Sequence, residues 1–139
     1  MNARDVMTPN PMTIRSQATV AEAWDLMGEM EIRHVPVVDD GTLVGMLSDR
    51  DLGRLDVTRM LVAEGADALR HELATPVAKV MSLDVIAAEP ETELGDIVDV
   101  LVEHKVGALP VVHPDTRELV GIISYVDILR ALQDLLGEE

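Results

Sequence analysis

The sequence repeats itself, and this internal duplication constrains the fold more than any other feature. Three blocks recur in the same order: VMTPNPMTI at Val6–Ile14 as VMSLDVIAA at Val80–Ala88, HVPVV at His34–Val38 as ALPVV at Ala108–Val112, and LVGMLSDRDL at Leu43–Leu52 as LVGIISYVDI at Leu119–Ile128. A repeat close to half the chain length predicts two copies of one structural unit, each of which needs the other to bury its apolar face. Any site built by one copy should therefore have a counterpart in the other.

The composition predicts an aliphatic core, because there is no Phe and the only aromatic residues are Trp24 and Tyr125. Cys is absent, which excludes disulfides and thiolate chemistry. No apolar stretch approaches the ~20 residues that span a bilayer. The N-terminal MNARDVM also lacks the apolar segment of a signal peptide. We therefore expect one domain's worth of soluble, cytoplasmic protein without a membrane partner.

The chain is strongly acidic, with a formal net charge of −15 at pH 7. This charge is typical of a soluble surface or of a salt-adapted lineage. Binding to a nucleic-acid backbone needs clustered Lys and Arg, and no such cluster occurs, so nucleic acid is not an expected partner. A phosphate-bearing ligand would need a local group of positive charges.

Each copy is predicted to run strand, helix, strand, strand, helix. The predicted elements of the first copy are a strand over Met12–Ile14, a helix with apolar residues at helical spacing from Val20 to Met30, strands over His34–Val38 and Leu43–Leu47, and a helix that Ser48 opens. Thr19 and Glu22 form a capping box at the start of the first helix. Asp39–Thr42 is a hairpin turn. Pro36 indicates an edge position or an irregular start for its strand.

The second copy repeats this pattern after an extra segment. Its predicted elements are a strand over Val85–Ala88, a helix capped by Thr92 that carries Leu94 to Leu101, strands over Ala108–Val112 and Leu119–Ile123, and a closing helix over Tyr125–Leu136. Residues 56–74 are predicted to form a helical linker with a break at Gly65. Thr75 and Pro76 then restart the pattern as helix cap and first helical residue. The predicted boundaries are residues 1–55 for the first copy, 56–74 for the linker and 75–139 for the second copy.

The motif G-h-h-S-x-x-D, in which h is an apolar residue, ends both copies as Gly45–Asp51 and Gly121–Asp127. It lies at a predicted strand-to-helix junction, where the first N–H groups and the helix dipole suit a phosphate. A carboxylate one turn into the helix can accept two hydrogen bonds from a ribose diol. Because Ser-x-x-Asp is also close to a capping box, each motif fits a purely structural helix cap as well.

The whole pattern, with Val-Met at the start of each copy, a Pro inside the second strand and G-h-h-S-x-x-D at the end, resembles the paired CBS domain, or Bateman module. The resemblance covers nearly the whole chain. It implies an α/β (α+β) fold of two pseudo-symmetric β-α-β-β-α repeats, with the two short sheets packed together and the helices outside. It also implies that an adenosyl ligand such as AMP, ADP, ATP or S-adenosylmethionine binds in clefts between the repeats, with no prosthetic group.

The resemblance also implies which residues bind this ligand. In that family the Asp of the motif holds the ribose, and the backbone around the Pro of the other repeat's second strand recognises the adenine. Carried onto this chain, one cleft would join Met46, Ser48 and Asp51 to Gly107, Ala108, Leu109 and Pro110, and the other would join Ile122, Ser124 and Asp127 to Arg33, His34, Val35 and Pro36. Both clefts keep their Ser and Asp, so both are expected to bind.

Arg33, His34 and Arg50 are the candidate contacts for a phosphate. The resemblance places Arg33 and His34 at the mouth of the Asp127 cleft, whereas the equivalent residues of the other cleft are uncharged. We therefore expect the Asp127 cleft to prefer phosphorylated ligands. Arg50, in the first turn of its helix, is a second source of charge, for the first cleft. The alternatives are a solvated strand end for Arg33 and His34 and a chance surface position for Arg50.

Catalytic and metal sites are not expected. There is no Cys nucleophile, no H-E-x-x-H and no Gly-rich phosphate loop, and His34, His71, His104 and His113 lack metal-ligand spacing. We expect a regulatory module rather than an enzyme, which binds an adenosyl ligand and signals to an unidentified regulated protein. The alternatives are a structural or oligomerisation module with empty clefts, and a fragment of a larger enzyme.

A homodimer is the expected assembly. Trp24 with Met27, and Leu129 with Leu132 and Leu136, form apolar stripes on the predicted outer helices. Two short sheets cannot fully cover these stripes, and a two-fold interface would bury them.

Overall fold

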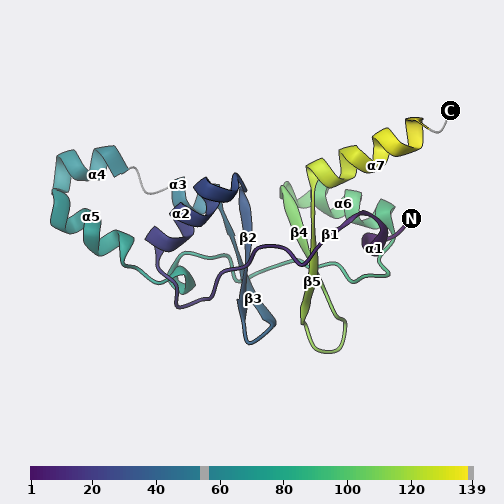
Figure 1. Cartoon of the computed structure of the whole chain (residues 1–139), viewed down its shortest axis with the longest axis horizontal. Coiled ribbons are helices and arrows are strands. Elements are labelled where there is room, and N and C mark those ends of the chain that lie inside the picture. Colours follow the sequence, from purple (N-terminus) through teal and green to yellow (C-terminus); the bar gives the residue numbers. More distant parts are fainter. Residues whose placement is uncertain (54–56, 138–139) are drawn as a thin grey trace. The chain divides into compact units, whose positions relative to one another are not determined.

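The computed structural model describes residues 1–53 and 57–137, and it divides the chain into two compact units (Figure 1). Unit 1 holds Met1–Pro11, Asp40–Leu43 and Ile86–Glu139, and unit 2 holds Met12–Asp39 and Val44–Val85. Both units combine helices with a short antiparallel sheet. The predicted mixed α/β class is therefore confirmed.

Unit 2 carries most of the first copy and the inserted segment. Its elements are α2 (Val20–Met30), β2 (His34–Asp39), most of β3 (Thr42–Ser48), α3 (Asp49–Gly53), α4 (Val57–Glu64), α5 (Ala66–Leu73) and the 3-10 helix η1 (Val77–Lys79). The predicted capping box of α2 is confirmed, because Thr19 Oγ1 accepts a hydrogen bond from Glu22 N while the Glu22 carboxylate accepts one from Thr19 N. The turn between β2 and β3 is Asp40-Gly41, both with positive φ, as a two-residue hairpin turn requires.

Unit 1 carries the second copy together with the N-terminal segment. Its elements are α1 (Ala3–Val6), β1 (Thr8–Pro9), α6 (Leu94–His104), β4 (Ala108–Val112), β5 (Leu119–Ser124) and α7 (Tyr125–Gly137). The sheet has the order β1-β5-β4, with both pairings antiparallel. The strand pair β4–β5 and the helices α6 and α7 confirm the predicted hairpin and the two predicted helices of the second copy.

Each copy begins with a leading segment that contains Val-Met, Val6-Met7 in the first copy and Val80-Met81 in the second. The leading segment of the first copy belongs to unit 1, with the rest of the second copy, and that of the second copy belongs to unit 2, with most of the first copy. In unit 1, Thr8 pairs with Ile122 of β5. At the equivalent place in unit 2, Ser82 forms a bridge with Met46 of β3, with N–H···O distances of 2.8 and 3.1 Å. The chain therefore exchanges its two Val-Met segments between the copies.

Two motif glycines allow this close approach. A Cβ added to Gly45 would lie 2.6 Å from Met81 Sδ and 3.0 Å from the Ser82 carbonyl oxygen. A Cβ added to Gly121 would overlap Met7 in the same way and lie 3.0 Å from the Thr8 carbonyl oxygen. The first residue of G-h-h-S-x-x-D is thus a glycine because a leading methionine covers it.

Each unit has its own aliphatic core, as the absence of Phe predicts. The unit 2 core consists of Ile14, Val20, Ala23, Met27, Val35, Val37, Leu47, Leu52 and Val77. The unit 1 core consists of Ala3, Ala88, Ile97, Leu101, Leu109, Val111 and Ile123. In both units most of these side chains come from the sheet strands and from the helix that precedes them in sequence. Val77 and Ala3 come from the exchanged leading segments, Ile14 and Ala88 from the parallel bridges, and Leu52 from α3.

The predicted strands over Met12–Ile14 and Val85–Ala88 are wrong, because each shrinks to a one-residue parallel bridge, Ile14 with Val37 and Ala88 with Val111. Ile14 N donates to Pro36 O and Ile14 O accepts from Val38 N. The next hydrogen bond of a parallel ladder would come from the N–H of residue 36. Proline has no N–H, so the ladder stops, and Pro110 stops the second one in the same way.

Two helix starts also differ from the prediction. Thr92 does not cap α6, because its Oγ1 accepts from Glu89 N at 3.0 Å, and the N-cap residue is Glu93 without a side-chain hydrogen bond. Pro76 is the N-cap residue of η1 rather than its first helical residue. The break at Gly65 is confirmed, with φ of 90° between α4 and α5. The predicted boundary at residues 55 and 56 lies outside the described residues.

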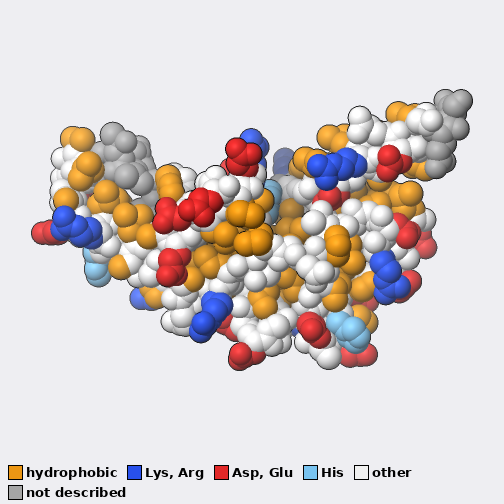
Figure 2. Space-filling view, in the orientation of Figure 1, with side chains coloured by type: hydrophobic (Ala, Val, Ile, Leu, Met, Phe, Trp, Pro, Cys, Tyr) orange, Lys and Arg blue, Asp and Glu red, His pale blue; other side chains and the backbone are white. Residues whose placement is uncertain are grey.

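The two expected apolar stripes differ in the structure. Met27 is 7% exposed and belongs to the unit 2 core, whereas Trp24 is 44% exposed. On α7 the stripe is exposed as expected, with Leu129, Leu132 and Leu136 each about half exposed or more, and hydrophobic side chains are visible along this helix (Figure 2). Among the described helices, none combines the length and the apolar character needed to cross a membrane.

Gly121→Ala should lower the free energy of unfolding by about 1–3 kcal/mol, because the new methyl group is forced against Met7 and the Thr8 backbone. Urea unfolding measures the change. Gly28→Ala, inside α2 with no atom within 4 Å of the new methyl group, is the control and should raise stability by about 0.5–1 kcal/mol. Equal effects at the two positions would show that Met7 does not press on Gly121.

Candidate ligand-binding site

The Ser-Asp pair of the first copy lies where β3 becomes α3. Ser48 N donates to Asp51 Oδ2 at 2.9 Å, Ser48 Oγ donates to the same oxygen at 3.1 Å, and Asp51 N donates back to Ser48 Oγ at 3.2 Å. Ser48 is half-buried at the end of β3, and the first turn of α3 brings the Asp51 carboxylate next to it. This reciprocal bonding is a capping box, so the structural interpretation of the motif is confirmed.

The pair of the second copy has the same geometry. Asp127 Oδ2 accepts from Ser124 N at 2.9 Å and from Ser124 Oγ at 3.1 Å, and Asp127 N donates to Ser124 Oγ at 3.4 Å. Capping uses one carboxylate oxygen in each copy, Oδ2. The other oxygen, Oδ1, is left for a further donor.

In unit 1 that further donor is Thr8, whose Oγ1 donates to Asp127 Oδ1 at 3.0 Å. Asp127 is only 8% exposed. The sequence reasoning missed Thr8, although it follows Val-Met in a repeated block and its counterpart, Ser82, is also a hydroxyl residue. The repeat was therefore the signal that could have identified it.

Arg33 and His34 lie at the start of β2, beside the first turn of α3 in the same copy. Asp49 N donates to Arg33 O at 2.9 Å. The pKa of His34 is lowered, mainly because burial disfavours the charged ring and further because Arg33 and Arg50 are close, while Asp49 and Asp51 oppose the shift. Two arginines, a half-buried imidazole and two carboxylates therefore share one end of unit 2.

The second copy has the same backbone arrangement without these charges. Tyr125 N donates to Gly107 O at 3.3 Å, as Asp49 N does to Arg33 O. Each unit thus places the start of its proline-containing strand beside the Ser-Asp pair of the same copy. The pairing of each Asp with the proline-containing strand of the other copy stays a prediction.

The other predicted site residues divide by burial. The side chains of Val35, Pro36, Ala108, Leu109 and Pro110 are buried, so these residues can offer a ligand only their backbone. Met46, Ile122 and Gly107 are half-buried, and Arg33 and Arg50 are exposed. The half-buried and exposed residues are therefore the ones whose side chains can contact a ligand.

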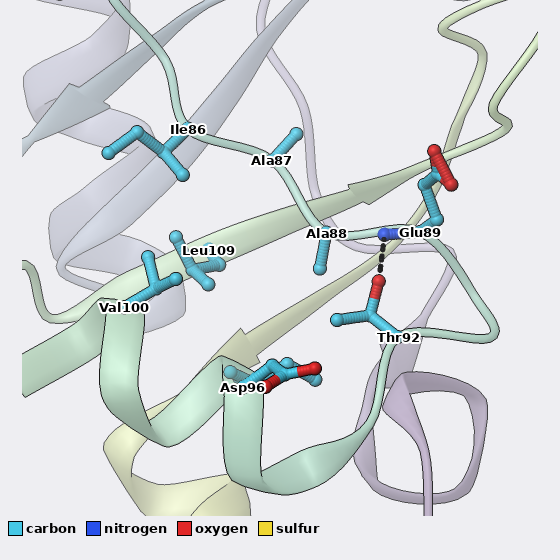
Figure 3. A pocket seen from close by; sticks show the side chains of 9 residues that line it. Ile86, Ala87, Ala88, Glu89, Thr92, Asp96, Val100 and Leu109 are labelled. Atoms are coloured by element: carbon cyan, nitrogen blue, oxygen red, sulfur yellow. Dashed lines mark hydrogen bonds between the residues drawn. The ribbon is translucent and has the colours of Figure 1, made fainter.

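A surface hollow of about 270 Å³ lies in unit 1 between the segment 86–89 and α6 (Figure 3). It is lined by Ile86, Ala87, Ala88, Glu89, Thr92, Asp96, Ile97, Val100 and Leu109. Leu109 is the only predicted site residue among them. The charged lining residues, Glu89 and Asp96, are both acidic, so the hollow does not suit a phosphate. Within the described residues, no group of three or more His, Asp or Glu side chains is arranged to hold a metal ion.

Comparison with known proteins connects this geometry to a family. The chain is 33% identical over 127 residues to the CBS domain-containing protein YhcV of Bacillus subtilis, covering 91% of this chain and 82% of that protein. The structure resembles that of a putative acetoin utilization protein (AcuB) from Vibrio cholerae, with 36% identity, a TM-score of 0.79 and coverage of 99% of this chain and 93% of that one.

A second solved structure, CBSX2 in complex with AMP, is 30% identical, with a TM-score of 0.81 and coverage of 96% and 97% of the two chains. Other relatives are larger enzymes: the chain spans only 22–23% of the homoserine O-acetyltransferases and of the inosine-5'-monophosphate dehydrogenase that it matches.

The family model described as CBS domain matches the chain twice, over residues 3–56 and 77–134. These ranges contain both Ser-Asp pairs and both proline-containing strands. The chain therefore belongs to the CBS domain family, as a tandem pair of CBS domains.

Proposed function

We propose that this CBS pair is a regulatory module that binds an adenosyl ligand, with Asp51 and Asp127 holding the ribose. The observation that carries the proposal is the repeated Ser-Asp pair: in each copy a carboxylate is fixed at a helix start, and its capping hydrogen bonds use Oδ2 rather than Oδ1. A ribose diol supplies such donors, and the nearby N–H groups of the helix start suit a phosphate. The AMP bound to CBSX2, a relative of 30% identity, supports this ligand class.

AMP, ADP, ATP and S-adenosylmethionine are the proposed ligands, and an unidentified regulated protein is the proposed receiver of the signal. We propose no catalytic turnover, because the hydroxyls of Ser48 and Ser124 are engaged with their own aspartates in helix caps and a lone carboxylate is a weak base for activating a hydroxyl nucleophile. The match to enzymes is confined to about a quarter of their length, which fits a regulatory segment. A cytoplasmic location stays a prediction.

The competing function is a structural or oligomerisation module with no bound nucleotide. The capping boxes favour it, because they give both Asp residues a role that needs no ligand. The two functions predict different effects when the carboxylate of Asp51 or Asp127 is removed. A cap contributes to stability alone, whereas a ribose contact contributes to affinity.

Asp51→Ala and Asp127→Ala should each weaken AMP binding at one site by about ten- to a hundredfold, because a hydrogen bond to a charged group contributes about 1.5–3 kcal/mol. Loss of the cap should lower stability by about 1 kcal/mol. Calorimetric titration with AMP and urea unfolding of the same samples measure both effects.

Asp96→Ala is the matched control, because Asp96 lies at the same third position of helix α6, which has no motif. It should leave the affinity for AMP unchanged. If the original chain binds no AMP and both substitutions only lower stability, the structural function is correct. If both variants bind AMP like the original chain, neither aspartate holds the ribose.

Arg33→Ala should weaken AMP about ten- to a hundredfold at one site and leave adenosine almost unchanged, because only AMP offers a phosphate to the guanidinium group. Calorimetry with both ligands gives the comparison. Arg15→Ala, which removes a cation outside the predicted site, is the control for net charge. Equal losses for adenosine and AMP, or no loss for either, would mean that Arg33 is only a solvated strand end.

A homodimer is the proposed assembly, with the exposed face of α7 as part of its interface. Val126, Leu129, Leu132 and Leu136 are 49–61% exposed on this helix, and exposed apolar side chains that gather on one surface are typical of protein–protein interfaces. Light scattering at micromolar concentration should give the dimer mass, and Leu129→Glu with Leu132→Glu should give the monomer mass. A monomer before substitution, with and without AMP, would rule out the dimer.

A further inference from the structure

The two motif aspartates have different hydrogen-bond partners. Asp127 Oδ1 accepts from Thr8 Oγ1 at 3.0 Å. Ser82 holds the equivalent place in unit 2, since Ser82 bridges Met46 as Thr8 pairs with Ile122. Within the described part of the chain, no hydrogen bond joins the Ser82 hydroxyl to Asp51, which accepts from Ser48.

The local sequence explains this difference. Thr8 precedes Pro9, and a residue before proline is confined to extended backbone. Its branched side chain also restricts χ1, and β1 pairs with β5 over two residues. Ser82 precedes Leu83, is unbranched and forms an isolated bridge. These constraints favour the orientation in which Thr8 points toward its aspartate, and they do not act on Ser82 in the same way.

The remaining acceptor capacity of the two carboxylates then differs. A carboxylate offers about four lone-pair sites, two on each oxygen. Ser124 donates twice to Oδ2 of Asp127, and Thr8 takes one of the two sites on Oδ1. A ribose diol brings two hydroxyl donors. It can place both on Oδ1 of Asp127 only if the Thr8 hydroxyl leaves that oxygen. Asp51 has no such competitor in Ser82.

We propose that Thr8 is a latch that occupies the ribose-binding oxygen of Asp127, so that the Asp51 site binds an adenosyl ligand first and the Asp127 site binds only when the Thr8 hydroxyl turns away. The inference rests on the proposed function of the Ser-Asp pairs. Thr8 is exposed, so its side chain has space to rotate. The observed ligand affinity at Asp127 equals the affinity of the open form multiplied by the fraction of molecules in which the latch is open.

The test isolates one site at a time. In a chain with Asp51→Ala, only the Asp127 site keeps its ribose carboxylate. Thr8→Val keeps the shape of Thr8 and removes the donor, so it should tighten adenosine binding in that chain about tenfold by calorimetry. Adenosine is the probe because it has no phosphate. In a chain with Asp127→Ala, the matched change Ser82→Ala should leave adenosine affinity within about twofold.

A second measurement needs no ligand. A double-mutant cycle of Thr8→Val and Asp127→Asn in urea unfolding should show a coupling of about tenfold in the unfolding constant. Coupling together with tighter adenosine binding establishes the latch. Absence of coupling, or unchanged adenosine affinity on Thr8→Val in a chain that binds adenosine, overturns it. Coupling in chains that bind no adenosine in any variant refutes the proposed function and leaves the Thr8 contact purely structural.

Discussion

The fit of a leading methionine over a glycine of G-h-h-S-x-x-D is the contact on which the rest of each unit depends. Met7 covers Gly121 in unit 1, and Met81 covers Gly45 in unit 2. Because these glycines have no side chain, the leading segment reaches hydrogen-bond distance of the strand, as in the pair Met46 and Ser82. The chain thereby completes each unit with a segment from the other copy, and neither copy folds as a sequence-contiguous block.

The same contact brings hydroxyl groups to the candidate site. In unit 1 it sets Thr8 beside Asp127, at the end of the strand that also positions Ser124. The duplicated arrangement has diverged at this junction: Thr8-Pro9 stands where the other unit has Ser82-Leu83, and Arg33-His34 stands where the other copy has Gly107-Ala108. A pair of sites that began as equivalent therefore differs in both its carboxylate partners and its local charge.

The sequence predicted the elements that have a periodic apolar pattern or a recognisable turn or capping motif. The two hairpins, the capping box at Thr19 and the closing helix α7 follow from apolar periodicity and turn chemistry, and the structure confirms them. The predicted strands at residues 12–14 and 85–88 do not extend beyond one bridge each, because Pro36 and Pro110 lack the N–H that the next hydrogen bond of each parallel ladder needs. Thr92 failed as a cap because its hydroxyl bonds to Glu89 instead.

The residues of the candidate site also differ in whether the sequence identifies them. Ser48, Asp51, Ser124 and Asp127 could be found from spacing alone, since capping is a local interaction. Spacing does not identify Thr8, which only its place in the repeated Val-Met block marks, because its contact with Asp127 joins residues 119 positions apart and depends on the exchange of leading segments. Long-range contacts of this kind need the register of the sheet, and a single sequence does not specify it.

Nitrogen-15-resolved NMR of the full chain during titration with AMP tests the central claim most directly, because it locates the ligand without any substitution. The account predicts the largest saturable amide shifts at Ser48 to Asp51 and at Ser124 to Asp127. Shifts confined to the hollow at Ile86 and Asp96, or no saturable shifts at all, would contradict it.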